Sequence, residues 1–182
     1  GASHRHLGVK GEEEYRGKGV SYCATCDGPF FRGKKVVVAG GGDTALTDAL
    51  YLSKLCSTVT IVHRREEFRA QKALQDKIAK VGNISTVMGR NIVEIKGDGS
   101  SVKEVVLNGG ETIEADGVFV FIGTVPNSSL VERIAKTENG FVVTDDSMET
   151  TLPGLFACGD VRNTTFRQVV TAASDGAKAA HG

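Results

Sequence analysis

The sequence contains no tryptophan, only three prolines and four cysteines, and no excess of charge of either sign. The 22 Lys and Arg residues balance the 22 Asp and Glu residues, whereas a nucleic-acid-binding protein normally carries a concentrated basic excess. Four cysteines are too few for a disulfide scaffold in a chain of 182 residues. No stretch reaches the ~18 apolar residues of a membrane-spanning helix. The composition therefore indicates a cytoplasmic protein with neither a nucleic-acid nor a membrane partner.

Glycine, by contrast, is abundant, with 23 residues, and it suits positions where the backbone turns sharply or closely approaches a ligand. The chain starts with Gly1-Ala2-Ser3, without an initiator methionine, and stops at Gly182 directly after a helix-like run. No signal peptide is visible. We therefore expect a fragment of a longer protein.

An alternation of strand and helix patterns predicts an α/β fold with a Rossmann-like parallel sheet. The elements expected first are the strand Lys35–Ala39, a helix over residues 43–55 with Asp43 as its N-cap, the strand 58–62 and a helix over residues 66–81. Between residues 84 and 122, short alternating runs separated by glycine-rich turns predict an antiparallel insertion. Its expected strands are 91–95, Val102–Leu107 and 111–115, followed by the fully apolar strand 118–122 and, near the C-terminus, a helix over residues 166–180. Residues 1–19 show no sustained apolar period and are expected to form a loop.

A glycine-rich loop follows the first of these strands. It fits G-x-G-x-x-A, the pattern of a dinucleotide-binding loop between a strand and a helix, in the residues Gly40, Gly41, Gly42, Asp43, Thr44 and Ala45. In this pattern the first glycine permits the turn, the second lets the backbone approach the pyrophosphate, and the small sixth residue allows close packing. The alternative is a tight turn that binds no ligand. The flanking strand and helix favour dinucleotide binding.

The residues at the end of the next strand indicate which dinucleotide binds. An NAD-specific site places an acidic residue about 20 positions after the glycines, but this sequence has His63, Arg64 and Arg65 there, followed by Arg69. Arginines suit the 2′-phosphate of NADPH, because guanidinium–phosphate hydrogen bonds are charge-assisted. The alternative is a solvated surface on which the arginines pair with two neighbouring glutamates. We prefer the phosphate site, with His63 as either a neighbour of the phosphate or a surface residue.

Cys23 and Cys26 form a C-x-x-C pair just before the first predicted strand, an arrangement typical of a redox-active dithiol. A structural zinc site needs two further ligands, and Cys56 and Cys158 each stand alone. We therefore expect a reversible disulfide and no metal. Asp27, next to the pair, is either the acid–base partner of thiol–disulfide exchange or a turn residue before a Gly-Pro pair.

Gly159 and Asp160 follow an apolar stretch, residues 155–158, that we expect to be a strand. A carboxylate at the carboxyl end of a strand lies where α/β proteins bind ligands. A turn aspartate explains the same pattern equally well.

Four motifs stand in one order along the chain. They are Cys23-Ala-Thr-Cys-Asp-Gly28, Gly40-Gly-Gly-Asp-Thr-Ala45, His63-Arg-Arg-Glu-Glu-Phe-Arg69 and Gly154-Leu-Phe-Ala-Cys-Gly-Asp-Val161. Together they closely resemble the low-molecular-weight, bacterial and archaeal type of thioredoxin reductase, within the pyridine nucleotide-disulfide oxidoreductases. The likeness runs from about Leu7 to Ala180, nearly the whole chain. A C-x-x-C pair ahead of an NADPH loop is specific to this group and its close relatives.

The resemblance implies two domains and an electron path. Residues 1–123 would form the NADPH-binding domain that carries the redox pair, and residues 124–182 the C-terminal portion of an FAD-binding domain. Electrons would pass from NADPH to FAD, then to the cysteine pair, and finally to thioredoxin or a similar small dithiol protein, in an enzyme that is a homodimer in its complete form. By this likeness Cys26 would face the flavin, Cys23 would attack the thioredoxin disulfide, and Asp27 would act as acid–base.

The resemblance also assigns flavin contacts to the C-terminal part of the chain. The assigned residues are Gly159 and Asp160 at the ribityl chain, Arg167, Gln168 and Val169 along the isoalloxazine, and Ile122 and Gly123 in the passage between the two cofactors.

Two departures set this chain apart from the family pattern. The family's first FAD segment, with its own G-x-G-x-x-G, is absent before Gly1, so we expect this chain alone to bind NADPH without turnover. In addition, Thr47 and Asp48 stand where the family usually has two acidic residues. One alternative is a stand-alone NADPH-binding module that senses redox state through its cysteines. Another is the related peroxidase-reductase flavoproteins, whose NADH preference does not call for the arginine pair.

Overall fold

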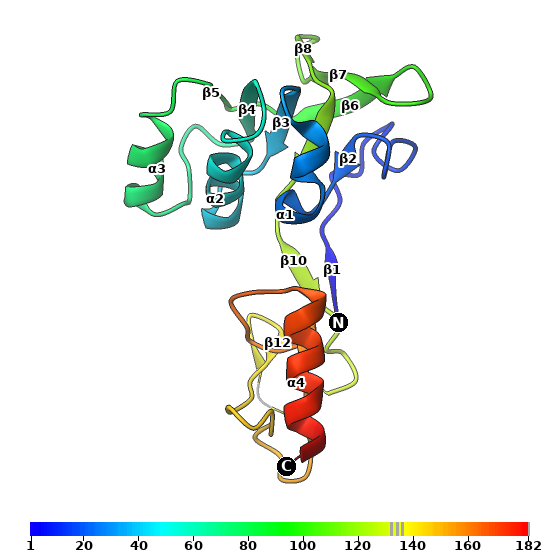
Figure 1. Ribbon diagram of the computed structural model, residues 1–182, viewed down its shortest axis with the longest axis vertical. Coiled ribbons are helices and arrows are strands. Elements are labelled where there is room, and N and C mark those ends of the chain that lie inside the picture. The colour runs from blue at the N-terminus through cyan, green and yellow to red at the C-terminus, as the bar shows by residue number, and fades with distance from the viewer. Residues whose placement is uncertain (132, 134, 136, 182) are drawn as a thin grey trace. The chain divides into compact units, whose positions relative to one another are not determined.

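A computed structural model of the protein describes residues 1–131, 133, 135 and 137–181, and its contacts divide the chain into two compact units (Figure 1). The larger unit comprises Arg5–Ile122, and the smaller unit combines Gly1–His4 with Gly123–Gly182. These units differ from the division into 1–123 and 124–182 only at the first four residues and at Gly123.

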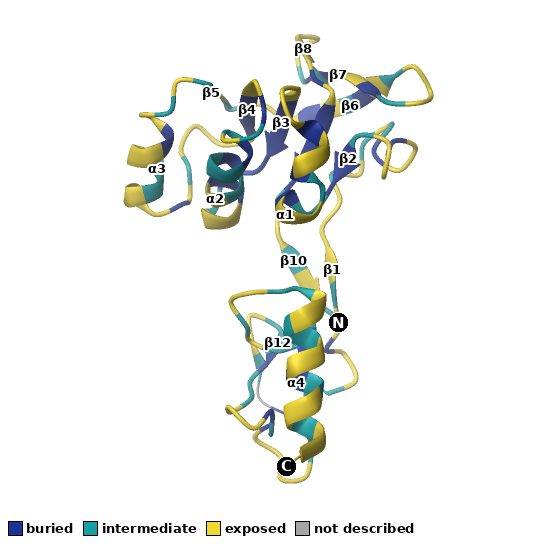
Figure 2. Ribbon diagram, in the orientation of Figure 1, coloured by how far each residue is buried: buried dark blue, intermediate teal, exposed yellow. Residues whose placement is uncertain are grey.

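The larger unit is built on a five-stranded parallel sheet with the strand order β2-β9-β3-β4-β5. The strands are β2 (Val20–Ser21), β3 (Lys35–Ala39), β4 (Thr58–His63), β5 (Ile84–Met88) and β9 (Gly117–Val120). Strands covered on both faces read as continuous apolar runs, and the side chains of Val36, Val37 and Val38 are all inaccessible to solvent (Figure 2). The parallel sheet confirms the expected α/β fold.

Two different layers cover the faces of this sheet. One is helical and contains α1 (Ala24–Asp27), the 3-10 turn η1 (Gly28–Phe31), α2 (Asp43–Leu52) and α3 (Lys72–Ile78). The other is a three-stranded antiparallel sheet of β6 (Ile92–Gly97), β7 (Val102–Leu107) and β8 (Thr112–Glu114). Because side chains alternate along a strand, Val36 and Val38 pack in the core under the helices, while Val37 and Ala39 pack in the core under the antiparallel sheet.

Three expectations for the larger unit are wrong. The N-cap of α2 is Gly42, so Asp43 is the first helical residue rather than the cap. The helix expected over residues 66–81 is confined to α3, because the backbone before it is held by the glycine loop: the amides of Arg69 and Ala70 both donate to the carbonyl of Gly41, at 2.8 and 3.2 Å. Strand β5 lies within residues 84–122, yet it pairs in parallel with β4 instead of joining the antiparallel insertion.

The smaller unit contains short strands and one long helix. Its elements are β1 (Ala2–His4) paired with β10 (Thr124–Pro126), β11 (Thr137–Glu138) paired with β12 (Phe141–Val142), the 3-10 turn η2 (Gly159–Val161) and α4 (Val169–His181). The expected loop at the N-terminus therefore contains a strand. The expected strand 155–158 is wrong, because only Phe156 forms a β-bridge, with Glu149. Helix α4 begins at Val169, later than the expected start at residue 166. The hydroxyl of Thr171, in the first turn of the helix, accepts the backbone amide of Gln168 at 3.1 Å.

No helix within the described part of the chain combines the length and the apolar character that a membrane crossing requires.

Candidate functional site

The predicted site residues of the larger unit gather at one edge of the parallel sheet. Strands that run in parallel end at the same edge, which is where open α/β sheets bind ligands. Cys23 comes shortly after the end of β2, Ile122 follows β9, Gly40 follows β3, and His63 is the last residue of β4. Topology alone therefore brings together motifs that are up to a hundred residues apart in the sequence.

The glycine loop turns tightly against its neighbours. Gly40 is buried with a φ of 147°, a conformation that favours glycine. A Cβ on Gly40 would overlap the carbonyl oxygen of Phe121 and lie 2.9 Å from the Cβ of Ala45. A Cβ on Gly41 would overlap the imidazole ring of His63. Because Gly40 and Gly41 have no side chain and Ala45 has a small one, the loop presents its backbone to a ligand.

Helix α2 begins at this loop and leaves its first backbone amides available. No side chain caps the helix at Gly42, and the first intrahelical bond runs from the Leu46 amide to the Gly42 carbonyl at 3.1 Å. The amides of Asp43, Thr44 and Ala45 therefore have no acceptor within the helix. A ten-residue helix also carries partial positive charge at its N-terminus, so this end suits a phosphate. The Asp43 carboxylate turns aside and accepts the Gln71 amide at 2.7 Å.

Three arginines lie next to the loop. Arg64, Arg65 and Arg69 are all exposed, and among the described residues none of them forms an ion pair. The pairing with neighbouring glutamates that the sequence left open is therefore absent from this part of the structure. The Nη2 atom of Arg69 lies 4.0 Å from the place that a Cβ on Gly42 would occupy. The Arg69 guanidinium thus lies close to the N-terminus of α2.

His63 is buried rather than a surface residue, with 6% of its surface exposed. Burial lowers the pKa of His63, and the positive charges of the three arginines lower it further, whereas a hydrogen bond with the Glu67 backbone raises it. The ring is therefore neutral at pH 7. Its Nε2 atom is buried and has no hydrogen-bond partner among the described residues.

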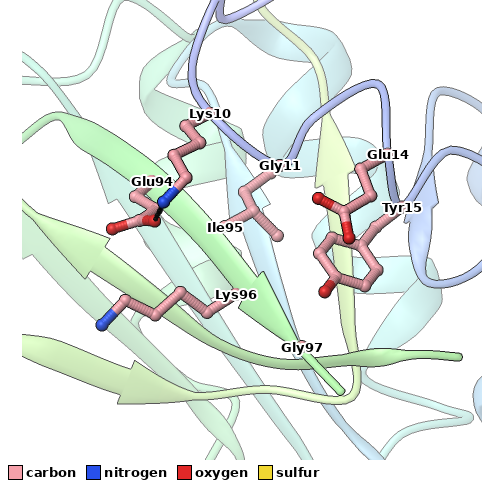
Figure 3. A pocket seen from close by; sticks show the side chains of 8 residues that line it. All are labelled: Lys10, Gly11, Glu14, Tyr15, Glu94, Ile95, Lys96 and Gly97. Carbon is pink, nitrogen blue, oxygen red and sulfur yellow. Dashed lines mark hydrogen bonds and ion pairs between the residues drawn. The ribbon is translucent and has the colours of Figure 1, made fainter. Parts of the chain in front are cut away.

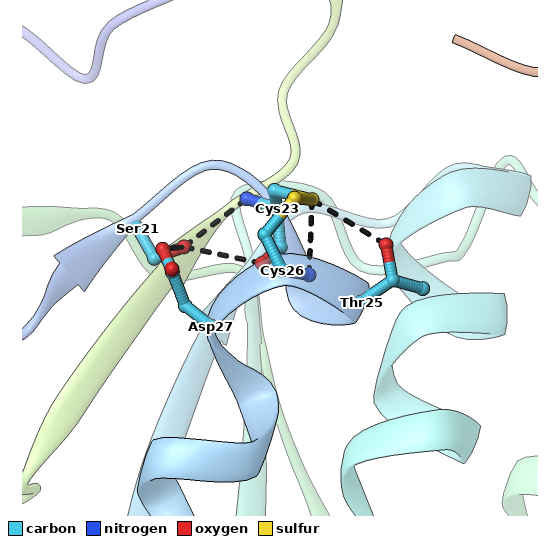
Figure 4. Close-up of a disulfide and its surroundings, with 5 residues drawn as sticks. All are labelled: Ser21, Cys23, Thr25, Cys26 and Asp27. Carbon is cyan, nitrogen blue, oxygen red and sulfur yellow. Dashed lines mark hydrogen bonds between the residues drawn. A yellow bond between two sulfur atoms is a disulfide. The ribbon is translucent and has the colours of Figure 1, made fainter. Parts of the chain in front are cut away.

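The cysteine pair forms the expected disulfide, at the start of α1 (Figure 4). The backbone amide of Cys26 donates to the Sγ atom of Cys23 at 3.2 Å, so Cys23 is also the N-cap of α1. Cys26 is exposed and Cys23 is half-buried. Asp27 ends α1, and its Oδ2 atom accepts the hydroxyl of Ser21 at 2.6 Å. Burial raises the pKa of the free thiol of Cys56 to about 11, which keeps that thiol protonated and unreactive.

A buried carboxylate, that of Glu12, is hydrogen-bonded to the residue that precedes Cys23 in the chain. Glu12 is 3% exposed, and it accepts the amides of Leu7 and Gly8 at 2.9 and 2.7 Å and the hydroxyl of Tyr22 at 2.9 Å. Burial and this bond to Glu12 raise the pKa of Tyr22 well above its usual range. Through Tyr22, the residue before Cys23, the network ties the N-terminal segment of the larger unit to the disulfide.

Asp48 lies on the face of α2 that packs against the sheet. Ala45 and Leu52, one turn before and after it, are fully buried, and Asp48 itself is half-buried. Among the described residues it has no hydrogen-bond or ion-pair partner. Burial alone raises the pKa of Asp48 to about 6.

The smaller unit arranges the residues that the resemblance assigned to flavin. Gly159 has a φ of 74°, and its amide donates to Oδ2 of the buried Asp175 at 3.2 Å. Asp160 follows within η2. The guanidinium of Arg167 lies over the ring of Phe141, with its Cζ atom 4.2 Å from the ring centroid. Its Nε atom is buried without a partner among the described residues.

The other assigned residues adjoin these. Gln168 precedes α4, Val169 begins it and is 85% exposed, and Ile122 and Gly123 lie on either side of the division between the units.

A hollow of about 280 Å³ in the larger unit is lined by none of the predicted site residues (Figure 3). It is lined by Lys10, Gly11, Glu14, Tyr15, Glu94, Ile95, Lys96 and Gly97. The Nζ atom of Lys10 and a carboxylate oxygen of Glu94 form an ion pair there at 2.7 Å, so the charges at this hollow largely satisfy one another. Within the part of the chain that the structure describes, no three His, Cys, Asp or Glu side chains come together as a metal site would require.

No motif in the sequence marks Ser21, Glu12 or Tyr22 as functional. Ser21 and Tyr22 are the two residues that precede Cys23, and Glu12 is the first residue of an acidic run that reads as a solvated loop. A buried position for a serine or a glutamate signals a satisfied polar contact, but burial is not visible in one sequence.

Comparisons with known proteins agree with this geometry. A sequence profile of the pyridine nucleotide-disulphide oxidoreductases matches residues 1–176. A thioredoxin reductase of Treponema pallidum (strain Nichols) is 50% identical over 186 residues, covering 100% of this chain and 60% of that protein. A thioredoxin reductase of Listeria innocua is 48% identical and covers 97% of this chain and 57% of that protein.

Solved structures give the same result. The crystal structure of a thioredoxin reductase from Streptococcus pyogenes MGAS5005 superposes with a TM-score of 0.92 and 42% identity, covering 100% of this chain and 61% of that one. The chain thus spans about 60% of the length of the relatives that it matches.

Proposed function

The chain belongs to the pyridine nucleotide-disulphide oxidoreductase family, and from this premise we propose that it is the NADPH-binding, dithiol-carrying part of a thioredoxin reductase. The observation that carries the proposal is the edge of the parallel sheet, where a dinucleotide loop with an arginine cluster and a C-x-x-C disulfide occur together. The names of the relatives support the same activity.

The residues of the larger unit fit NADPH. Gly41 has no side chain that would clash with His63, the uncapped amides at the start of α2 suit the pyrophosphate, and the neutral His63 offers a buried nitrogen that no described residue satisfies. Arg64 and Arg65 stand at the end of β4, where the ribose end of a dinucleotide lies. In the strand order β4-β3-β9-β2, the arginines, the glycine loop, Ile122 and the cysteine pair follow one another. We take this order as the direction of the bound dinucleotide, with its 2′-phosphate on the arginines.

The described residues of the smaller unit fit part of a flavin site. Gly159 permits a close approach of its backbone, and Arg167 carries a buried, unpaired Nε atom. We propose that Gly159 and Asp160 hold the ribityl chain of FAD and that the segment from Arg167 to Val169 lies along the isoalloxazine. FAD, when bound, supplies a two-electron carrier between NADPH and a disulfide.

The cysteine pair performs the final exchange in this proposal. The thiolate of Cys23 attacks the disulfide of thioredoxin, one thioredoxin sulfur leaves, and a mixed disulfide forms. Cys26 then attacks the Sγ atom of Cys23, which restores the Cys23–Cys26 disulfide and releases thioredoxin as a dithiol. Asp27 moves protons between the thiols and the leaving sulfur atoms. We further propose that the complete enzyme is a homodimer and acts in the cytoplasm, where a dithiol is kept in a reducing environment.

A single-turnover experiment tests the exchange step without any flavin. The chain is reduced with dithiothreitol, freed of reagent and mixed with an equimolar amount of oxidised thioredoxin, and the thiols of both proteins are counted by mass spectrometry after alkylation. We expect the chain to lose two thiols as thioredoxin gains two. Cys26→Ser is expected to trap a mixed disulfide at Cys23, and the control Cys158→Ser to behave as the parent chain.

Thioredoxin that stays oxidised beside a reduced, folded chain contradicts the proposal. That result leaves the alternative of an NADPH-binding redox sensor, whose cysteines exchange with no thioredoxin.

A further inference from the structure

Ser21 is a buried serine at the end of the edge strand β2, with 4% of its surface exposed. It lies two residues before Cys23 and six before Asp27. Figure 4 shows its hydroxyl between the start of α1 and the side chain of Asp27. A serine that is buried so completely needs partners for its hydroxyl, and both of its close partners belong to the redox motif.

The hydroxyl acts as a donor and an acceptor at once. It donates to Oδ2 of Asp27 at 2.6 Å, at the short end of the range for hydrogen bonds between oxygen atoms. It accepts the backbone amide of Cys23 at 3.1 Å. The carbonyl oxygen of Cys23 lies further away, at 3.4 Å, so the single hydroxyl proton is directed to the carboxylate.

Asp27 depends on this one contact for its orientation. Within the described part of the chain, Ser21 is the only residue that hydrogen-bonds the Asp27 carboxylate, and no ion pair holds it. The other carboxylate oxygen, Oδ1, has no partner among those residues. It therefore remains able to take up or release a proton.

We propose that Ser21 is the positioning residue of the dithiol centre. Its hydroxyl fixes the Asp27 carboxylate relative to the backbone of Cys23. The proposal rests on the acid–base role of Asp27 in the proposed function. Without the hydroxyl, Asp27 is free to rotate away, and protons reach the cysteine sulfur atoms less often in the correct geometry. Only a side chain that both donates and accepts can do this, which restricts the position to serine or threonine among the small residues.

Reduction of the disulfide by dithiothreitol tests the idea on the chain itself. A dithiothreitol thiolate attacks one sulfur of the Cys23–Cys26 bond, the bond breaks, and the departing sulfur takes its proton from Asp27. The second thiol of the reagent then closes the reagent's ring, so that dithiothreitol is oxidised and the pair becomes two thiols. The proton of this thiol passes to the second departing cysteine sulfur, and Asp27 regains its proton from the solvent, which received one when the first reagent thiol ionised. The rate is followed by acid quenching, alkylation and mass spectrometry.

Four chains form a double-mutant cycle: the parent, Ser21→Ala, Asp27→Asn and the combination of both. We expect Asp27→Asn to slow reduction at least about tenfold and Ser21→Ala to slow it about five- to tenfold. If Ser21 acts through Asp27, adding Ser21→Ala to Asp27→Asn changes the rate less than about twofold. Ser21→Thr is expected to restore most of the rate. Ser53→Ala, which removes a hydroxyl bonded to the Leu50 carbonyl at 2.9 Å at the C-terminal end of α2, is the matched control and leaves the rate unchanged.

The outcomes separate this proposal from the one on which it rests. Equal slowing by Ser21→Ala in both backgrounds overturns the proposal, because it shows that Ser21 supports only the backbone turn, and Asp27 then keeps its role. No slowing by Ser21→Ala in the parent chain also overturns it. No slowing by Asp27→Asn overturns the acid–base role of Asp27 and the Ser21 proposal together. The melting temperature of each variant shows that the chains compared are folded, and if Ser21→Thr does not fold, the cycle alone decides.

Discussion

Replacing Asp48 with asparagine is expected to stabilise the larger unit at neutral pH. Burial raises the pKa of Asp48 from 3.8 to about 6, and no described residue compensates its charge. Folding therefore favours the protonated carboxyl, and the ionised form opposes folding. Asparagine keeps the shape of the side chain and carries no charge at any pH.

The pKa shift sets the magnitude of the effect. A shift of about 2 units corresponds to at most about 3 kcal/mol, at 1.36 kcal/mol per unit. Because the Asp48 side chain keeps some contact with water, we expect Asp48→Asn to raise the free energy of unfolding by about 1 to 3 kcal/mol at pH 7.5. The unfavourable contribution grows as the pH rises from the unfolded value of 3.8 through the folded value of about 6. At pH 4.5 linkage reduces the gain to about a third of its value at pH 7.5.

Tyrosine fluorescence during urea unfolding measures the stability of the larger unit of the chain. All three tyrosines lie within Arg5–Ile122, and the chain has no tryptophan. Unfolding curves of the parent and of Asp48→Asn at pH 4.5, 6 and 7.5 are compared at a common m-value. Asp76→Asn is the control, because Asp76 is exposed on α3. A stability gain that is the same at all three pH values, or a loss at pH 7.5, would show that the charge of Asp48 does not oppose folding.

Three further outcomes are expected. Gly41→Ala should place a methyl group against the ring of His63, lower stability by about 1 to 3 kcal/mol and weaken NADPH binding in a calorimetric titration, whereas Gly82→Ala, which meets no atom within 4 Å, should do neither. Thiol counts before and after reduction should differ by two because of the Cys23–Cys26 disulfide, and stoichiometric zinc that survives gel filtration would contradict this. The 182-residue chain, incubated with FAD and freed of the excess, should not sustain NADPH oxidation with thioredoxin, since the flavin residues proposed around Asp160 cover only the ribityl and isoalloxazine parts. Retained yellow colour with turnover would show otherwise.

Local pattern was sufficient to predict the elements at the centre of the fold. Strand β3 is a β-branched run between a charged residue and three glycines, and α2 follows with apolar residues at helical spacing. The structure confirms both. The C-x-x-C disulfide was equally predictable, because its two cysteines lie within one turn of α1.

What could not be predicted depends on contacts between distant residues. The segment before α3 has a helical apolar pattern. The backbone amides of Arg69 and Ala70 nevertheless donate to the carbonyl of Gly41 and not to a carbonyl within a helix. Tertiary hydrogen bonds of this kind override local propensity. Strand β5 is only partly buried, so its residues do not form the continuous apolar run of a strand that is covered on both faces. The sequence therefore gives no sign that β5 joins the parallel sheet. The role of Ser21 requires knowing that β2 ends beside the last residue of α1.

Calorimetric titration of the chain with NADPH and with NADH tests the proposed nucleotide site most directly. NADPH is expected to bind more tightly than NADH, because each guanidinium–phosphate contact contributes roughly 1.5 to 3 kcal/mol. Replacing Arg64 and Arg65 with glutamine should weaken NADPH binding about 100-fold or more and leave NADH binding nearly unchanged. The control Arg16→Gln removes an exposed arginine paired with Glu13 and should affect neither nucleotide. Equal losses for NADPH and NADH, or no binding of either nucleotide to the folded chain, would contradict an NADPH site at the glycine loop and the arginines.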